Sequence, residues 1–251
     1  MSGRRVDLRT ADGVMDTYLF QPPGTGSWPA VIFYMDAFGI RPQLDEMAER
    51  LASNGYFVVV PNLYYRSGAF APFDPKQVFG GETPERQRFL GMIHSIDPTK
   101  IMSDTRAVLD YLDNEPAARE GKMAAVGYCM GGGFAISALG TFPDRVAAGA
   151  SFHGASLATD KPDSPHLLAK SIRGRLYLGV AGIDPGFPPE QRNRLEQALT
   201  EAGVDYTLEM YEGAKHGFAV TGHLVYDRDA SERHWTRLVE LLNDTLQPVS
   251  V

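Results

Sequence analysis

The chain of 251 residues has a hydrophobic share of 43% and a formal net charge of −7. An apolar share of this size can fill the core of one domain, which we expect to span residues 1–251. Nucleic acids and anionic membranes are bound mainly through clustered cations, so the negative charge and the lack of a Lys/Arg-rich run argue against both as partners. The single cysteine excludes an internal disulfide and a cysteine-based metal cluster.

The N-terminal residues are polar and lead into a strand pattern without the apolar segment of a signal peptide, and no stretch has the length of a membrane span. We therefore expect a cytoplasmic protein. The sequence leaves open whether it is a monomer or a small homo-oligomer.

The first predicted element is an antiparallel hairpin. Strand-like segments at 6–8 and 14–20 flank Asp12-Gly13, a pair that supplies the positive φ of a tight turn. Six later runs are short, bounded by turn residues and mostly apolar, which is typical of strands buried on both faces. These runs are 30–35, 56–61, 123–127, 147–152, 176–181 and 206–211.

Helix-period stretches alternate with these strands. They cover 43–53, 103–114, 131–141, 189–202 and 230–246. Alternating strands and helices predict an α/β fold with a mostly parallel, doubly wound sheet and helices on both faces.

Segment 63–97 departs from this alternation because it carries aromatic residues among prolines and glycines. A long irregular segment of this kind can be a lid or a pocket wall. The alternative is a loop whose aromatic side chains fill a small core of their own.

Cys129 is the candidate nucleophile. In Gly127-Tyr128-Cys129-Met130-Gly131 a predicted buried strand turns directly into a helix, which is the nucleophile-elbow pattern with glycines two residues on either side. Backbone N–H groups at a helix start stabilise a thiolate, and the Met130 N–H would stabilise an oxyanion. Taken alone, a cysteine at such a junction is more often a small buried apolar residue, but the elbow spacing favours the catalytic interpretation.

The fold places an acid and then a histidine after the nucleophile, each at the carboxyl end of a later strand. Asp184 and His216 meet this order, with Asp184 orienting His216 and His216 polarising Cys129. Of the other histidines, His153 and His166 stand in loops where they could line a pocket. The remaining three, His94, His223 and His234, have the pattern of surface or helix residues.

Metal and nucleotide sites are weakly supported, because the sequence has neither a His-x-x-x-His pair with a helical carboxylate nor a phosphate loop. We expect no metal and no cofactor.

Five motifs are spread over most of the chain: Asp36-Ala37-Phe38-Gly39, Pro61-Asn62-Leu63-Tyr64, Gly127-Tyr128-Cys129-Met130-Gly131-Gly132, Ala181-Gly182-Ile183-Asp184 and His216-Gly217-Phe218. Together they resemble the dienelactone hydrolase (carboxymethylenebutenolidase-like) family of the α/β-hydrolase superfamily. The resemblance implies a Cys129–His216–Asp184 triad, in agreement with the order derived from the residues. Phe38, Tyr64 and His153 are the expected pocket residues.

The resemblance also implies a role for the loop after the third strand. The family usually has a glutamate there that contacts the resting thiol, and here the position holds Asp36. Because aspartate is one methylene shorter, we expect a longer or water-bridged contact; the alternative is an aspartate that caps helix 41–53. The next residue, Ala37, would give the second oxyanion N–H.

Relatives that act on dienelactone hold its carboxylate with arginines, one of them four residues after the catalytic histidine. Here that position is Val220. A second arginine is suggested at Arg88 in Glu85-Arg86-Gln87-Arg88, where an exposed helical arginine is an equally good interpretation. Losing one arginine should weaken the binding of anionic lactones and admit neutral, apolar acyl groups.

The sequence thus predicts an ester or lactone hydrolase that forms a thioester on Cys129 and hydrolyses it with water activated by His216. Activated esters, enol esters and lactones suit a thiolate nucleophile better than amides do. Two alternatives remain: a catalytically silent small-molecule binding protein on a hydrolase scaffold, and a thiol-based redox protein.

Overall fold

The computed structural model describes residues 3–246, which form one eight-stranded sheet in the order β1-β2-β4-β3-β5-β6-β7-β8. β1 (Arg4–Thr10) and β2 (Gly13–Phe20) form the predicted antiparallel hairpin, and β2 also pairs antiparallel with β4. All other neighbours pair parallel. The remaining strands are β3 (Ala30–Tyr34), β4 (Phe57–Pro61), β5 (Met123–Tyr128), β6 (Val146–Phe152), β7 (Arg175–Ile183) and β8 (Tyr206–Lys215).

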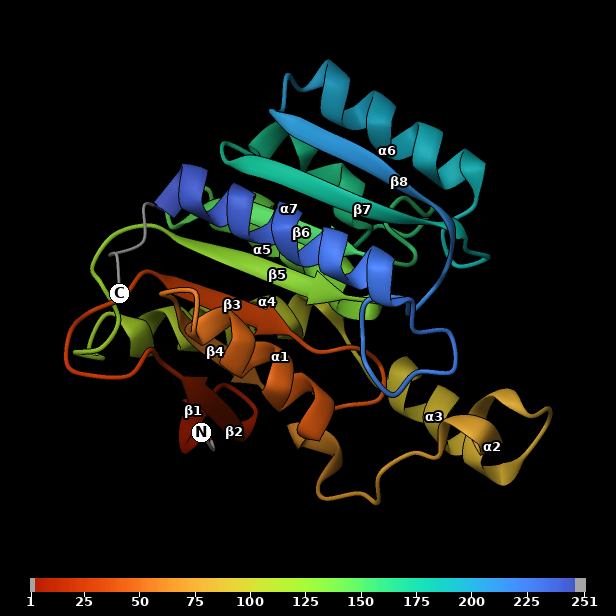
Figure 1. The fold of residues 1–251 in the computed structure, drawn as a ribbon, viewed down its shortest axis with the longest axis horizontal. Helices are drawn as coiled ribbons and strands as arrows, with labels where there is room; N and C mark the ends of the chain where they lie inside the picture. Colours follow the sequence, from red (N-terminus) through yellow and green to blue (C-terminus); the bar gives the residue numbers. More distant parts are fainter. Residues whose placement is uncertain (1–2, 247–251) are drawn as a thin grey trace.

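Helices cover both faces of the sheet. Figure 1 shows α1 (Pro42–Ala52) and α7 (Arg228–Leu246) on the near face, and α4 (Pro98–Leu112) and α5 (Met130–Thr141) behind it. α6 (Pro189–Glu201) lies beside β8 at one edge. Because the central strands are covered on both sides, every residue of β3, β4 and β5 is buried, as their continuous apolar runs predict. The predicted doubly wound α/β fold is confirmed.

Segment 63–97 is more regular than the sequence analysis expected. It contains a short 3₁₀ turn η1 (Tyr65–Ser67) and two helices, α2 (Pro75–Phe79) and α3 (Pro84–His94). α3 begins with a hydrogen bond from the Arg86 N–H to the Thr83 side chain and has proline at its first position. Phe89 is its single buried residue, so the helix lacks the wide apolar face by which periodicity is recognised.

The aromatic side chains of this segment form a second, smaller core with the loop after β3. Its members are Ala37, Phe38, Phe73, Val78 and Phe89. In Figure 1, α2 and α3 project from the body beyond the ends of the parallel strands. The segment therefore has its own core, and because it also stands over the carboxyl edge of the sheet, its role as a lid or pocket wall stays a prediction.

α4 starts earlier than the predicted 103, at Pro98. The Asp97 carboxylate accepts hydrogen bonds from the N–H groups of Thr99 and Lys100, and Pro98 takes the first helical position. Aspartate followed by proline is an ordinary helix-start signal in sequence. Within residues 3–246 no helix is long and apolar enough to span a membrane.

Candidate active site

Cys129 lies between β5 and α5 with φ 56° and ψ −120°, in the positive-φ region that residues other than glycine rarely adopt. The two glycines flanking it are required by space. A Cβ on Gly127 would stand 1.9 Å from the Gly131 carbonyl oxygen, and one on Gly131 would stand 2.5 Å from the Tyr34 carbonyl oxygen. The strained elbow inferred from the glycine spacing is confirmed as a backbone geometry.

Asp184 and His216 stand at the same edge of the sheet. Asp184 immediately follows β7 and His216 immediately follows β8, which is longer than its predicted apolar run. His216 Nδ1 lies 2.7 Å from Asp184 Oδ2, and the other carboxylate oxygen accepts a hydrogen bond of 2.8 Å from the Gly186 N–H. The Asp184 side chain is almost fully buried, so its orientation and that of the imidazole are fixed.

The surroundings of His216 favour its charged form. Burial alone would lower the pKa of His216, but the negative charge of the Cys129 sulfur and the hydrogen bond to Asp184 outweigh it and raise the pKa from 6.5 to about 10. The surroundings of His216 therefore favour its protonated form.

Asp36 is buried in the loop after β3, and its partners differ from those expected. Arg41 donates to both carboxylate oxygens, over 2.6 and 2.7 Å, and His223 Nε2 lies 3.2 Å from Asp36 Oδ2. The Phe38 N–H donates to Asp36 Oδ1 over 2.9 Å. Burial would raise the pKa of Asp36, but the His223 hydrogen bond and the Arg41 charge lower it below its ordinary value.

These contacts correct one of the two interpretations of Asp36. It does not cap α1, whose N-cap residue is Arg41 and which has no side-chain cap. Within the described residues the direct hydrogen bonds of its carboxylate go to the Phe38 N–H, Arg41 and His223, and a longer or water-bridged contact with Cys129 stays a prediction.

Ala37 and Met130, the expected oxyanion donors, belong to two segments joined by Tyr64. The Tyr64 hydroxyl donates to the Ala37 carbonyl over 2.9 Å and lies 3.7 Å from Met130 Sδ. Tyr64 is 1% exposed and lines neither cavity beside Cys129. It therefore supports the loop of Ala37 from behind, and its substrate contact stays a prediction.

Two cavities open beside Cys129. The first, of about 320 Å³, is called the aromatic chamber because Phe38, Phe79 and Phe89 line it together with His216. The second, of about 340 Å³, is called the α5 chamber because Met130, Phe134 and Ser137 of α5 line it. Both volumes lie near the lower end of the range found for small-molecule sites.

His153 lines the aromatic chamber, as predicted, and is fully buried. Its backbone is held at φ 39°, its ring centroid lies 5.2 Å from that of His216, and neither ring nitrogen has a hydrogen-bond partner among the described residues. Burial and the nearby charge of His216 keep the pKa of His153 well below its ordinary value. His153 therefore lines the chamber as an uncharged side chain.

The remaining histidines do not all lie where the sequence pattern indicated. His223, expected at the surface or in a helix, lies in the wall of the aromatic chamber with a side chain 9% exposed. His234 is in α7 but buried, 3.0 Å from the Tyr128 hydroxyl. His94 is exposed, and His166, which lines neither chamber, is hydrogen-bonded to Ser164 in the wall of the α5 chamber.

The two positions compared with the family's arginines lie away from the cavities. Arg88 pairs with Glu85 at 2.7 Å, donates to the Ala71 carbonyl and stacks over Phe73, so its guanidinium is engaged within its own segment, and its substrate contact stays a prediction. Val220 is fully buried in the core and lines neither chamber. The apolar character of the aromatic chamber therefore comes from its aromatic residues and not from Val220.

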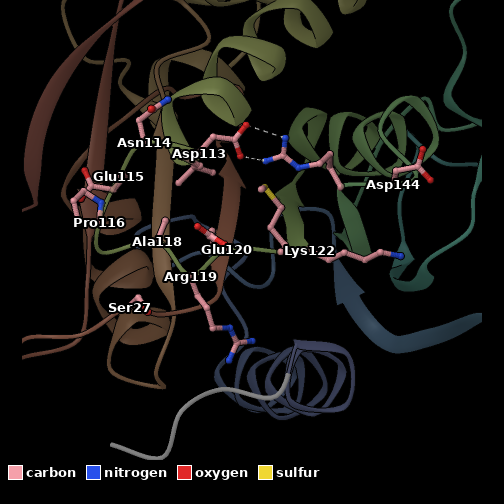
Figure 2. A pocket seen from close by; sticks show the side chains of 15 residues that line it. Ser27, Asp113, Asn114, Glu115, Pro116, Ala118, Arg119, Glu120, Lys122 and Asp144 are labelled. Carbon is pink, nitrogen blue, oxygen red and sulfur yellow. Dashed lines mark hydrogen bonds and ion pairs between the residues drawn. The ribbon is translucent and has the colours of Figure 1, made fainter.

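A larger depression, of about 920 Å³, lies at the opposite end of the sheet, where β3 and β5 begin. Figure 2 shows its charged lining, which includes Asp113, Glu120 and Lys122. Asp113 is paired to Arg145, which also lines the depression. None of the predicted site residues is among its lining residues. The size of a cavity alone therefore does not identify where the predicted site residues of this molecule lie.

Within the part of the chain that the structure describes, no group of three or more His, Cys, Asp or Glu side chains is arranged to hold a metal ion. The reactive side chains that do meet are those at the carboxyl edge of the sheet. Together with the strand order and the elbow, they define an α/β-hydrolase fold.

Comparisons with known proteins identify the family. Residues 15–246 match the Dienelactone hydrolase family. The carboxymethylenebutenolidase of Pseudomonas sp. (strain P51) is 34% identical over 115 residues, 46% of each chain, and the hydrolase tropI of Talaromyces stipitatus is 28% identical over 213 residues, 84% of this chain and 78% of its own. The dienelactone hydrolase-like promiscuous phosphotriesterase P91 from metagenomic libraries shares the fold, with a TM-score of 0.77 at 23% identity over 97% of this chain and 98% of its own.

The chain belongs to the dienelactone hydrolase family. It is accordingly a hydrolase, and the family implies a small-molecule substrate.

Proposed function

We propose that this hydrolase cleaves carboxylic esters or lactones with Cys129 as its nucleophile, His216 as its acid and base, and Asp184 as the residue that orients His216. The observation that carries the proposal is the strained Cys129 at the elbow, placed at the same sheet edge as the hydrogen-bonded His216–Asp184 pair. A cysteine with a structural role only would not require a positive φ at the sheet edge that holds the hydrogen-bonded His216 and Asp184.

The reaction proceeds in two halves. The Cys129 thiolate attacks the carbonyl carbon, and the electron pair of the C=O bond moves to oxygen. The N–H groups of Met130 and Ala37 stabilise this oxyanion; removal of one such donor typically costs roughly 3 kcal/mol of transition-state stabilisation. When the adduct collapses, the C–O bond breaks, His216 gives its proton to the leaving oxygen, and a thioester remains.

In the second half, His216 takes a proton from water while the oxygen of that water attacks the thioester carbon. The second adduct expels the Cys129 thiolate and releases the carboxylic acid. The enzyme returns to its thiolate–imidazolium state, so no further reagent is consumed.

The chemistry of sulfur restricts the substrates. A thiolate leaves more readily than an alkoxide, so the first adduct reverts unless the alcohol portion is a good leaving group. The aromatic chamber offers no unpaired cation among its lining residues, because His216 is paired with Asp184 and the charge of Arg41 beside the chamber is neutralised by Asp36. Neutral activated esters, enol esters and lactones are therefore favoured over anionic lactones and over amides.

The test is turnover of p-nitrophenyl acetate and of a lactone panel that includes dienelactone, with intact-mass detection of an acyl adduct. Wild type should form a Cys129-dependent adduct and turn over, whereas Cys129→Ala should do neither. His216→Ala should accumulate little product, and Arg145→Ala, in the distant depression of Figure 2, is the matched control that should behave as wild type. Absence of both turnover and adduct on every substrate would contradict the proposal.

A further inference from the structure

Cys129 stands where the aromatic chamber and the α5 chamber meet. Cys129, Ala37 and Ile93 are the residues that line both cavities. They are the proposed nucleophile, the proposed second oxyanion donor and a side chain of α3. A carbonyl group bound for attack therefore lies at the junction, and its two substituents have separate spaces to occupy.

The position of His216 assigns the two substituents. His216 lines the aromatic chamber and is absent from the lining of the α5 chamber. The leaving oxygen must come within hydrogen-bond distance of the imidazole that protonates it. The alcohol portion of an ester therefore extends into the aromatic chamber, and the acyl portion extends into the α5 chamber.

The aromatic chamber suits a ring or another flat, apolar group. Phe38 and Phe89 pack with centroids 4.8 Å apart in its wall, and Leu224 and Val225 add aliphatic surface. Phe79 is 57% exposed and stands at the entrance. Aromatic groups pack favourably against such side chains in offset or edge-to-face geometry.

The α5 chamber has a mixed lining. Met130, Phe134 and Ile96 contribute apolar surface. The lining also includes the polar residues Ser137 and Thr159 and the exposed Lys161. Such a wall fits an acyl chain that carries both apolar and polar groups.

From this arrangement we infer that the enzyme takes a two-armed ester, with an aromatic or similarly apolar alcohol arm in the aromatic chamber and a separate, extended acyl arm in the α5 chamber. The inference rests on the proposed function, because it uses Cys129 as the nucleophile and His216 as the acid. A small lactone ties both arms into one ring at the junction and leaves each chamber largely empty, so open aryl or enol esters with extended acyl chains should be turned over faster.

The experiment uses two ester series. One keeps p-nitrophenol and lengthens the acyl chain from acetate to octanoate; the other keeps the acetyl group and enlarges the alcohol from methyl to phenyl to naphthyl. For wild type, kcat/KM should rise along both series. If kcat/KM rose along neither series, or if small lactones were preferred over every open ester, the inference would be overturned.

Two variants each narrow one chamber. Ser137→Leu should lower the octanoate-to-acetate ratio of kcat/KM by about tenfold, and Val225→Trp should lower the naphthyl-to-phenyl ratio by a similar factor, since one or two added carbon groups in a pocket give effects of this size. Thr159→Trp, nearer the surface, replaces Ser137→Leu should the latter lower the thermal midpoint.

Crossed effects, in which Ser137→Leu changes the alcohol ratio or Val225→Trp changes the acyl ratio, would reverse the assignment and contradict the inference. Arg145→Ala is the control for both ratios. The two failures give different results. If the proposed function is wrong, no ester shows Cys129-dependent turnover. If only the two-arm inference is wrong, turnover remains but the two variants do not each change a different ratio of kcat/KM.

Discussion

The Asp36 carboxylate is held by the Arg41 guanidinium through two hydrogen bonds of 2.6 and 2.7 Å, at the start of the loop that presents the Ala37 N–H. The same carboxylate accepts the Phe38 N–H and so closes a turn around Ala37. An acidic residue at this position therefore fixes the direction of a proposed oxyanion donor, a role that the family resemblance did not imply.

Asp36→Asn should reduce both stability and turnover. The neutral amide leaves Arg41, whose side chain is 17% exposed, without its counter-charge, and breaking a buried ion pair of this kind costs roughly 3 kcal/mol. The turn around Ala37 should loosen, so kcat should fall more than KM rises. Denaturant unfolding and steady-state kinetics measure the two effects.

The control for this prediction is Arg173→Gln, which removes an ion pair to Asp144 between side chains that are 68% and 82% exposed. Exposed pairs of this kind contribute about 0–1 kcal/mol. Equal losses of stability in Asp36→Asn and Arg173→Gln would show that the Asp36–Arg41 pair contributes no more than a surface pair does.

Gly127→Ala should prevent correct folding of the elbow. The added methyl carbon would stand 1.9 Å from the Gly131 carbonyl oxygen and 2.7 Å from the Gly132 nitrogen, and these are backbone atoms that cannot move without displacing α5. We expect a loss of several kcal/mol, of the order of the largest single-residue effects. Thermal unfolding and the yield of folded protein measure this.

Gly91→Ala is the matched control, because Gly91 lies in α3 with open space around its Cα. Alanine at an exposed helix position stabilises by roughly 0.5–1 kcal/mol relative to glycine. If Gly91→Ala also lost stability, the lack of space around Gly127 would not explain the loss of stability in Gly127→Ala.

The sequence analysis recovered the parts of the molecule that depend on local patterns. The central strands follow from their continuous apolar runs, and Cys129, Asp184 and His216 could be proposed because each immediately follows a strand that is easily recognised. α3 was not found, because a helix whose one buried residue is Phe89 has little apolar periodicity.

The residues around Asp36 could not be found in the same way. His223 reaches Asp36 across 187 positions of sequence, and its own neighbours in the chain carry no motif. Arg41 is closer, but an arginine just before Pro42 has no pattern that separates a buried ion pair from a solvated helix start. Such partners are fixed by tertiary packing, which a single sequence does not display.

Arg88→Ala should leave substrate selectivity as it is. Because Arg88 is engaged by Glu85, by backbone carbonyls and by Phe73, its loss removes no group from either chamber. We expect kcat/KM for neutral esters and for dienelactone to stay within about twofold of wild type, with stability reduced by roughly 0.5–1 kcal/mol. A selective loss of activity toward anionic lactones would instead support the role implied by the family resemblance.

The His216 charge should make stability depend on pH above neutrality. The pKa of His216 is raised to about 10 in the folded protein, against about 6.5 in the unfolded chain, so the stability gained from its proton is complete below about 6.5 and is lost as the pH rises through about 10. Denaturant unfolding between these pH values should show the decline. In Cys129→Ala, which lacks the charge that chiefly raises this pKa, the decline should end at a lower pH, and an NMR titration of the His216 ring should report the same displacement.

His234 should act in the opposite direction, on the acid side. It is fully buried between the Tyr128 hydroxyl and the Ser231 carbonyl, and burial lowers its pKa from 6.5 to about 3. A lowered histidine pKa means that the unfolded chain binds the proton first, so this contribution to stability is present above about 6.5 and is lost as the pH falls toward 3. At pH 5 the loss from one such histidine is about 2 kcal/mol, because each pH unit below the unfolded pKa costs about 1.4 kcal/mol. His234→Gln, which keeps a polar side chain without a titrating ring, should lose less stability between pH 7 and pH 5 than wild type does, and identical losses in the two proteins would assign the acid sensitivity to other groups.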